Sequence, residues 1–160
     1  MSRSSEDRIL REHLAKLLTG KQAHVDFDTA VSDMPLGLQG KKPQGASHTP
    51  WEILEHLRIA QWDILEFSRN PKHVSPNFPA GYWPEEAAPP EPGSWERSVG
   101  LFQADLKAFR EFVQDSATDL YTPIPHGDGQ TVLREVLVAA DHNAYHLGEL
   151  VLVRRMLGAW

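Results

Sequence analysis

The sequence of 160 residues contains no cysteine and no long apolar run. The absence of cysteine excludes disulfides, a thiolate nucleophile and a cysteine-type zinc site, and it is compatible with a reducing compartment. No apolar run approaches the roughly 20 residues that a membrane span needs. The charged N-terminal stretch MSRSSEDRILREHL lacks the apolar block of a signal peptide. We therefore expect a soluble cytoplasmic protein with no membrane partner.

Basic residues are also few. Lysine and arginine number 16 against 22 acidic residues, which gives a formal net charge of −6. Binding to a nucleic-acid backbone needs a basic surface, so we expect no nucleic-acid partner. No P-loop, GxSxG motif or dinucleotide fingerprint is present. The length suits one domain that spans residues 1–160.

Four helical stretches account for most of the chain. They are expected at residues 4–18, 49–69, 94–116 and 131–157. The second has the clearest start, because Thr49, Pro50 and Glu52 form a capping box with proline at the first helical position. Ser94 and Thr131 are the expected caps of the last two. No segment alternates with a period of two, so the sequence predicts an all-α four-helix bundle.

The connection between the second and third helices, residues 71–94, is long and contains seven prolines. A connection of this length is unusual between antiparallel neighbours. It can instead cross the whole bundle and leave these two helices parallel. That path predicts an up-down-down-up topology with a Pro-rich crossover.

Histidines lie on the inward faces of two of these helices. His142 and His146 are four residues apart in DHNAYHLGEL, so both imidazoles lie on one face and reach one ion. His56 lies at the edge of the core stripe of residues 49–69. A lone histidine there is usually a hydrogen-bonded core residue, but three on facing helices favour a metal site in the bundle core.

The depth of the histidines in the bundle gives a second test. His56 lies 13 residues before the expected helix end at Arg69, and the midpoint of His142 and His146 lies 13 residues after Thr131. Antiparallel helices would bring the three imidazoles to one level. Parallel helices would separate the levels by about 10 Å at 1.5 Å per residue. The match favours the antiparallel arrangement.

Three imidazoles without a thiolate suit a divalent transition metal, namely Zn, Ni, Fe or Co. Three protein ligands leave positions open for water or substrate, as in catalytic sites. HNAYH has Asn143 where a zinc protease has its glutamate, which excludes that class. Glu149, three residues after His146, either orients an imidazole or is an ordinary solvated or salt-bridged glutamate.

Further candidates each have a structural alternative. His24 faces the site as a proton donor or fourth ligand, or is an ordinary residue of the first rod. Asp63, two turns after His56, holds an imidazole or a water, or lies on the helix surface. His48 and Trp83 line a substrate pocket. The alternatives are that His48 is an ordinary loop residue and that Trp83 simply packs across the bundle. His126 is expected at the opposite end of the bundle, and His13 and His73 at the surface.

Trp62 falls opposite the core stripe of its helix, with Trp51 and Leu65 expected near it. A bulky apolar patch on an outer face indicates either cover by a loop or a protein interface. The sequence therefore raises a homodimer as one interpretation.

The motifs HTPWEILEHLRIAQWDI and DHNAYHLGELVLVRRMLGAW, with the four-helix layout, resemble the DinB/YfiT-like superfamily of metalloenzymes. The resemblance covers most of the chain and implies a four-helix bundle with metal ligands at His56, His142 and His146. Some relatives are thiol-dependent transferases or isomerases that use a low-molecular-weight thiol. Many others have no assigned reaction.

Two functions follow from these observations. In the first, the metal activates a thiol or water that attacks a small electrophilic molecule, so the chain is an S-transferase or a hydrolase. A transferase would need a thiol cosubstrate, because the chain has no cysteine. In the second, the chain is a non-catalytic metal-binding bundle that acts as a stress-related or structural dimer.

Overall fold

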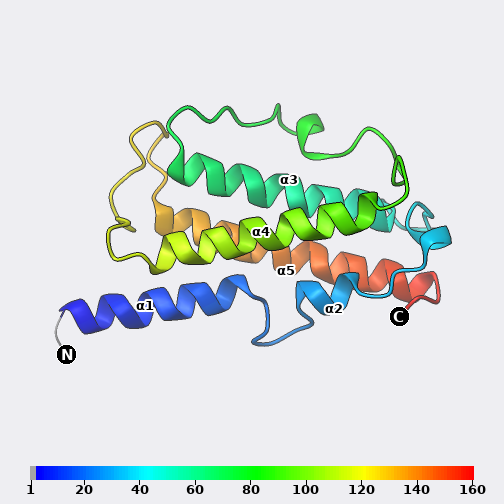
Figure 1. The fold of residues 1–160 in the computed structure, drawn as a ribbon, viewed down its shortest axis with the longest axis horizontal. Helices are drawn as coiled ribbons and strands as arrows, with labels where there is room; N and C mark the ends of the chain where they lie inside the picture. The colour runs from blue at the N-terminus through cyan, green and yellow to red at the C-terminus, as the bar shows by residue number, and fades with distance from the viewer. Residues whose placement is uncertain (1–2) are drawn as a thin grey trace.

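The computed structural model describes residues 3–160 and is built from helices (Figure 1). The α-helices are α1 (Arg3–Leu18), α2 (Phe27–Val31), α3 (Pro50–Arg69), α4 (Ser94–Gln114) and α5 (Val132–Met156). Two short 3-10 helices, η1 (Leu36–Leu38) and η2 (Ala80–Tyr82), lie in the connections. No strand occurs in residues 3–160, which confirms the all-α prediction.

Local capping explains where the long helices begin. The Thr49 hydroxyl accepts a hydrogen bond from the Glu52 amide (3.1 Å), and the Glu52 carboxylate accepts one from the Thr49 amide (2.7 Å). Thr131 caps α5 as expected. The prediction that Ser94 caps α4 is wrong by one residue, since Ser94 is the first helical residue. Gly93 precedes it with φ of 82°, a left-handed conformation that glycine adopts without steric cost.

Thr49 also joins α3 to the crossover segment, because its hydroxyl donates to the Ala87 carbonyl (2.7 Å). We expect Thr49→Ala to lower the free energy of unfolding by about 1 to 2 kcal/mol, the range for loss of a threonine cap. For a chain of this length the melting temperature should fall by roughly 2 to 8 °C. Thermal unfolding followed by circular dichroism measures the change. Thr49→Ser keeps the hydroxyl and should melt close to wild type; equal melting of all three proteins would contradict the assignment.

The long helices lie side by side, as in a four-helix bundle (Figure 1). Helix α3 packs against α4 and α5, and α1 packs against the same two helices. Residues 70–93 leave the end of α3, run back along its length and enter α4, so that α3 and α4 point the same way (Figure 1). Helix α5 points the opposite way to α3. This arrangement positions one turn of α3 beside the middle of α5.

Two apolar clusters make the core. One surrounds Leu54, Trp95 and Leu150, and the other surrounds Leu65, Phe109 and Val136. No helix of residues 3–160 has the length and apolar character needed to cross a membrane.

The expected outer-face patch around Trp62 is wrong for two of its three residues. Trp51 and Leu65 are buried in the two core clusters, because α3 is covered on several sides and not along a single stripe. Trp62 is partly exposed, and its ring meets the edge of the His73 ring at 4.9 Å between centroids. The crossover segment therefore covers this face in part, and a homodimer remains a prediction.

Candidate metal centre

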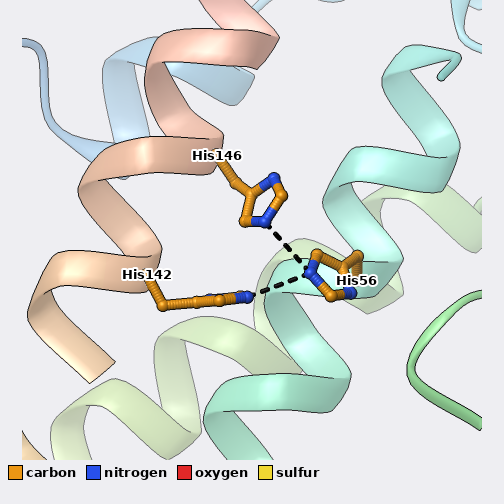
Figure 2. A group of neighbouring side chains, drawn as sticks. All are labelled: His56, His142 and His146. Atoms are coloured by element: carbon orange, nitrogen blue, oxygen red, sulfur yellow. Dashed lines mark hydrogen bonds between the residues drawn. The ribbon is translucent and has the colours of Figure 1, made fainter. Parts of the chain in front are cut away.

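The three predicted histidines meet in the interior, between α3 and α5. Figure 2 shows His142 and His146 on successive turns of α5, both directed at His56 on α3. The Nε2 atom of His56 lies 2.9 Å from that of His142 and 3.1 Å from that of His146. One ligand atom from each ring falls within 4.8 Å of the others, a spacing that allows all three to hold one metal ion.

The outer nitrogens of two rings fix where their protons lie. His56 Nδ1 is 2.8 Å from the Tyr82 carbonyl oxygen, and His146 Nδ1 is 2.9 Å from a Glu149 carboxylate oxygen. Both oxygens can only accept, so both Nδ1 atoms carry the hydrogen. The Nε2 atoms of His56 and His146 then present lone pairs to each other at 3.1 Å. Two lone pairs at this distance repel each other, whereas a cation between them attracts both.

Two of the three rings are neutral at neutral pH. Burial lowers the pKa of His56, against the opposing effect of its hydrogen bond to the Tyr82 carbonyl. Burial, with the neighbouring His146 and His56, lowers the pKa of His142 to about 4. Both rings are therefore neutral at pH 7, the form that binds metals. The donor set fits a divalent transition metal, with no thiolate and no ligating carboxylate in the cluster.

Glu149 lies behind the cluster and links two histidines. One carboxylate oxygen accepts from His146 Nδ1, and the other is 2.8 Å from His48 Nδ1. The hydrogen bond from His146 is the main cause of its lowered pKa, with His48 adding to it. The carboxylate is therefore ionised at neutral pH and orients His146, as outer carboxylates do for metal-bound histidines. These contacts are the ones that the orienting role expects, and the role itself stays a prediction.

Trp83 lies in a stack between two imidazoles. Its ring is parallel to that of His56 (3.9 Å, 1°) and nearly parallel to that of His48 (4.0 Å, 18°). This indole covers one face of His56 and separates it from His48. Tyr145, an exposed residue of α5, meets the His146 ring edge-on at 4.9 Å. Aromatic rings therefore border the histidine cluster on two sides.

Asp63 acts on the cluster through the crossover segment. Its buried carboxylate accepts from the Tyr82 hydroxyl (2.6 Å) and is bonded to His73 Nε2 (2.7 Å). Tyr82 in turn places its carbonyl on His56. Burial, followed by Asp63, raises the pKa of the Tyr82 hydroxyl to about 12, so it stays a donor. The prediction that His73 lies at the surface is wrong, since its side chain is only 6% exposed and contacts the Asp63 carboxylate.

The remaining histidines lie elsewhere. His24 is exposed, hydrogen-bonds to the Val25 carbonyl and borders a separate cavity of about 280 Å³ beside α1, α4 and α5. The structure does not bring it into the cluster. His126 bonds the Phe67 carbonyl near the opposite end of α3, and His13 is exposed on α1, both as expected.

Sequence reasoning missed three groups near the cluster. The Tyr82 carbonyl carries no sequence signal, since any residue has one. Gln61 and the amide of Asn143 had a signal: each is a polar residue within an apolar stripe. Gln61 follows Leu57 by four residues, and Asn143 precedes Leu147 by four. Both are buried and hydrogen-bonded to each other at 2.8 Å.

Glu149 gives a direct prediction. We expect Glu149→Gln to weaken metal binding about 10- to 100-fold, as the loss of an outer carboxylate partner typically does. The amide keeps the shape but removes the charge that holds His146 and His48. Competition with a chromophoric chelator measures the affinity. Glu66→Gln, at the far end of α3, is the control for a lost carboxylate; equal affinities in all three proteins would contradict the role of Glu149.

Comparison with known proteins agrees with this geometry. The family model of the DinB superfamily matches residues 20–150, more than four fifths of the chain. No curated protein and no solved structure matches the sequence. The match includes all three clustered histidines, the whole of α3 and residues 132–150 of α5. The chain belongs to the DinB superfamily.

Proposed function

We propose that His56, His142 and His146 hold one divalent transition metal through their Nε2 atoms, and that this centre makes the chain an enzyme. The metal, which is Zn, Ni, Fe or Co, activates a thiol or water toward a small electrophilic molecule. One observation carries the proposal. The Nε2 atoms of His56 and His146 are 3.1 Å apart in a buried site, and each turns its lone pair toward the other because the hydrogen of each ring lies on Nδ1. Membership of a metal-binding superfamily supports it.

The proposal uses an up-down-down-up bundle with residues 70–93 as the crossover. The chain directions in Figure 1 support this topology, because α3 and α5 run in opposite directions. The crossover then has a function beyond connection. It supplies the Tyr82 carbonyl to His56 and the Trp83 ring that lies on it.

When bound, the metal supplies a Lewis acid that lowers the pKa of a coordinated thiol or water. Side chains of the protein orient the ligands and limit the access of water. Glu149 holds the Nδ1 proton of His146, so that Nε2 stays a free ligand. Trp83 excludes water from one face of His56. His48 is 30% exposed and hydrogen-bonded to the partly buried carboxylate of Glu149, so it joins this carboxylate to solvent.

The absence of cysteine decides how a transferase would operate. The nucleophilic sulfur must come from a low-molecular-weight thiol, since the chain offers none. Sulfur then forms a bond to the electrophilic carbon, the leaving group departs with the electron pair, and the thiol proton goes to solvent. In the hydrolase version, water takes the place of the thiol.

The test loads the purified protein separately with Zn, Ni, Fe and Co. Each form is offered a panel of low-molecular-weight thiols with a model aryl or alkyl halide, and activated esters without thiol. The proposal predicts turnover above the uncatalysed rate with at least one metal, and its loss on chelation and in His142→Ala. Turnover that needs the thiol identifies a transferase, and turnover without it identifies a hydrolase. No turnover with any metal would contradict an enzyme.

One observation favours the alternative of a non-catalytic metal-binding dimer. His56 and His146 are largely buried, and Trp83 covers one face of His56, which limits access to the centre. This function predicts a metal-dependent melting temperature without turnover. Analytical ultracentrifugation of wild type and Trp62→Glu tests the dimer, which this substitution should dissociate.

A further inference from the structure

The cavity of about 280 Å³ beside α1, α4 and α5 lies where two helices are interrupted. Helix α1 ends at Leu18 and α2 begins at Phe27, and the chain between them loops away from the bundle (Figure 1). Thr19, Gly20 and His24 of this loop line one side of the cavity. The break between α1 and α2 therefore leaves a hollow in the side of the bundle.

The cavity and the histidine cluster use different faces of α5. His142 and His146 are directed at α3, whereas Ala144 and Leu147 line the cavity (Figure 2). Ala144 follows His142 by two residues, which turns it by about 200° around the helix at 100° per residue. Helix α5 itself therefore separates a molecule in the cavity from the metal centre.

Apolar side chains make most of the wall. Phe27 and Phe102, whose rings stack at 3.8 Å between centroids, are buried on its inner side. Leu106 of α4 is partly buried, and Leu17 and Leu137 are exposed on the rim. A cavity of about 150 Å³ with apolar walls already admits a benzene ring. This one is therefore large enough for the ring or short alkyl group of a small molecule, which gains by leaving water.

Two polar residues at the rim select the charge of such a molecule. Asp141 is exposed on α5, and within residues 3–160 its carboxylate has no hydrogen-bond or ion-pair partner. His24 Nδ1 is 2.8 Å from the Val25 carbonyl oxygen, which can only accept, so Nε2 of the neutral ring is an acceptor. No lysine or arginine of the described residues lines the cavity. Two acceptors without a competing cation favour a protonated amine, which has three N–H donors and a positive charge.

One small molecule can reach both kinds of surface. Asp141 and Leu147 both line the cavity and are six residues apart on α5, about 9 Å along its axis at 1.5 Å per residue. An aromatic ring that carries an amine on a short alkyl chain has a similar length. The cavity therefore matches a molecule with an apolar body at one end and an ammonium group at the other.

We propose that this cavity is a binding site for a small amine with an apolar body. The apolar body lies among the leucines of the wall, and the ammonium group donates to the Asp141 carboxylate and to His24 Nε2. This site lies on the other side of α5 from the metal centre and needs no metal. The inference therefore goes beyond the proposed function, and either can fail without the other.

The first test uses metal-free ¹⁵N-labelled protein at pH 8 and three probes with the same apolar body: 2-phenylethylamine, 2-phenylethanol and 3-phenylpropionate. We expect saturable shifts of the Gly20, Leu106 and Ala144 amide signals with the amine, weaker binding of the neutral alcohol and the weakest binding of the carboxylate. No saturable binding of the amine would overturn the inference. Equal or tighter binding of the alcohol or the carboxylate would also overturn it.

The second test removes the charge at the rim. Asp141→Asn should weaken amine binding by about 5-fold, the value for an exposed ion pair, to about 12-fold, the value for a hydrogen bond to a charged group. Binding of 2-phenylethanol should stay unchanged. Asp128→Asn, in the exposed loop before α5, is the matched control and should bind the amine as wild type does. Equal amine affinity in Asp141→Asn and wild type would overturn the inference.

The third test fills the cavity. Ala144→Phe places a ring in the hollow and should abolish binding of both the amine and the alcohol. Ala104→Phe, on the exposed face of α4, adds the same ring outside the cavity and should leave binding unchanged. Circular dichroism shows whether each variant is folded, and the Asp141→Asn comparison decides the matter if Ala144→Phe is not. Wild-type binding by folded Ala144→Phe would place the amine elsewhere and overturn the inference.

Discussion

Replacing His56 by alanine is expected to reduce bound metal from about one ion per chain to a background level. His56 supplies the Nε2 atom that lies within 3.1 Å of both other ligand atoms, so its loss leaves only the two histidines of α5. Even the loss of an outer partner of a metal-bound histidine costs about 10- to 100-fold in affinity. Loss of a ligand should cost more. Metal analysis of the dialysed protein by mass spectrometry measures the content.

The control for this substitution is His13→Ala, which removes an exposed histidine of α1 that lies away from the cluster. It should retain the wild-type metal content. His56→Ala protein that still holds one ion per chain, with a wild-type helical spectrum, would show that the ion binds elsewhere. Loss of metal in both variants would point to weak, unspecific binding.

The second large effect is on stability. The metal binds the folded state, where three imidazoles meet, so a free concentration of 100 times the dissociation constant should stabilise the fold by about 2.7 kcal/mol. For a chain of this size the melting temperature should rise by roughly 5 to 11 °C. A chelator should reverse the rise, as differential scanning calorimetry with and without the metal would show.

His142→Ala separates this effect from general stabilisation by salt. Without metal, the variant should melt near the wild-type temperature, because it removes one of three converging nitrogens from a crowded buried site. With metal, it should show little of the rise. An equal rise in wild type and variant would contradict a site built on His142.

The parts that could be predicted from the sequence depend on local signals. The Thr49 capping box set the start of α3, and Thr131 set the start of α5. With those helix starts known, the helical rise of 1.5 Å per residue places His56 and the two histidines of α5 at the same depth in the bundle. The structure brings these three rings together. At α4 the local signal misled by one residue, because Gly93 was a better N-cap than Ser94.

The parts that could not be predicted depend on contacts between distant segments. His73 is hydrogen-bonded to Asp63, and the Tyr82 carbonyl reaches His56, because the crossover lies along α3. The length of this segment predicts a crossover, but nothing in its sequence specifies which of its residues contact α3. Trp51 was placed on the surface because a helical wheel assumes one buried face, whereas α3 is packed on several. Gln61 had a signal, but its partner Phe102 lies on another helix.

X-ray absorption at the metal edge of loaded, untagged protein tests most directly whether the three histidines form an open metal centre. We expect scattering from three imidazole nitrogens and a light atom from solvent. On addition of the thiol identified by the activity screen, a sulfur shell should appear, at about 2.3 Å for zinc. A complete coordination sphere of protein atoms that no thiol or substrate changes would contradict an open, activating centre. A spectrum without imidazole scattering would contradict the site itself.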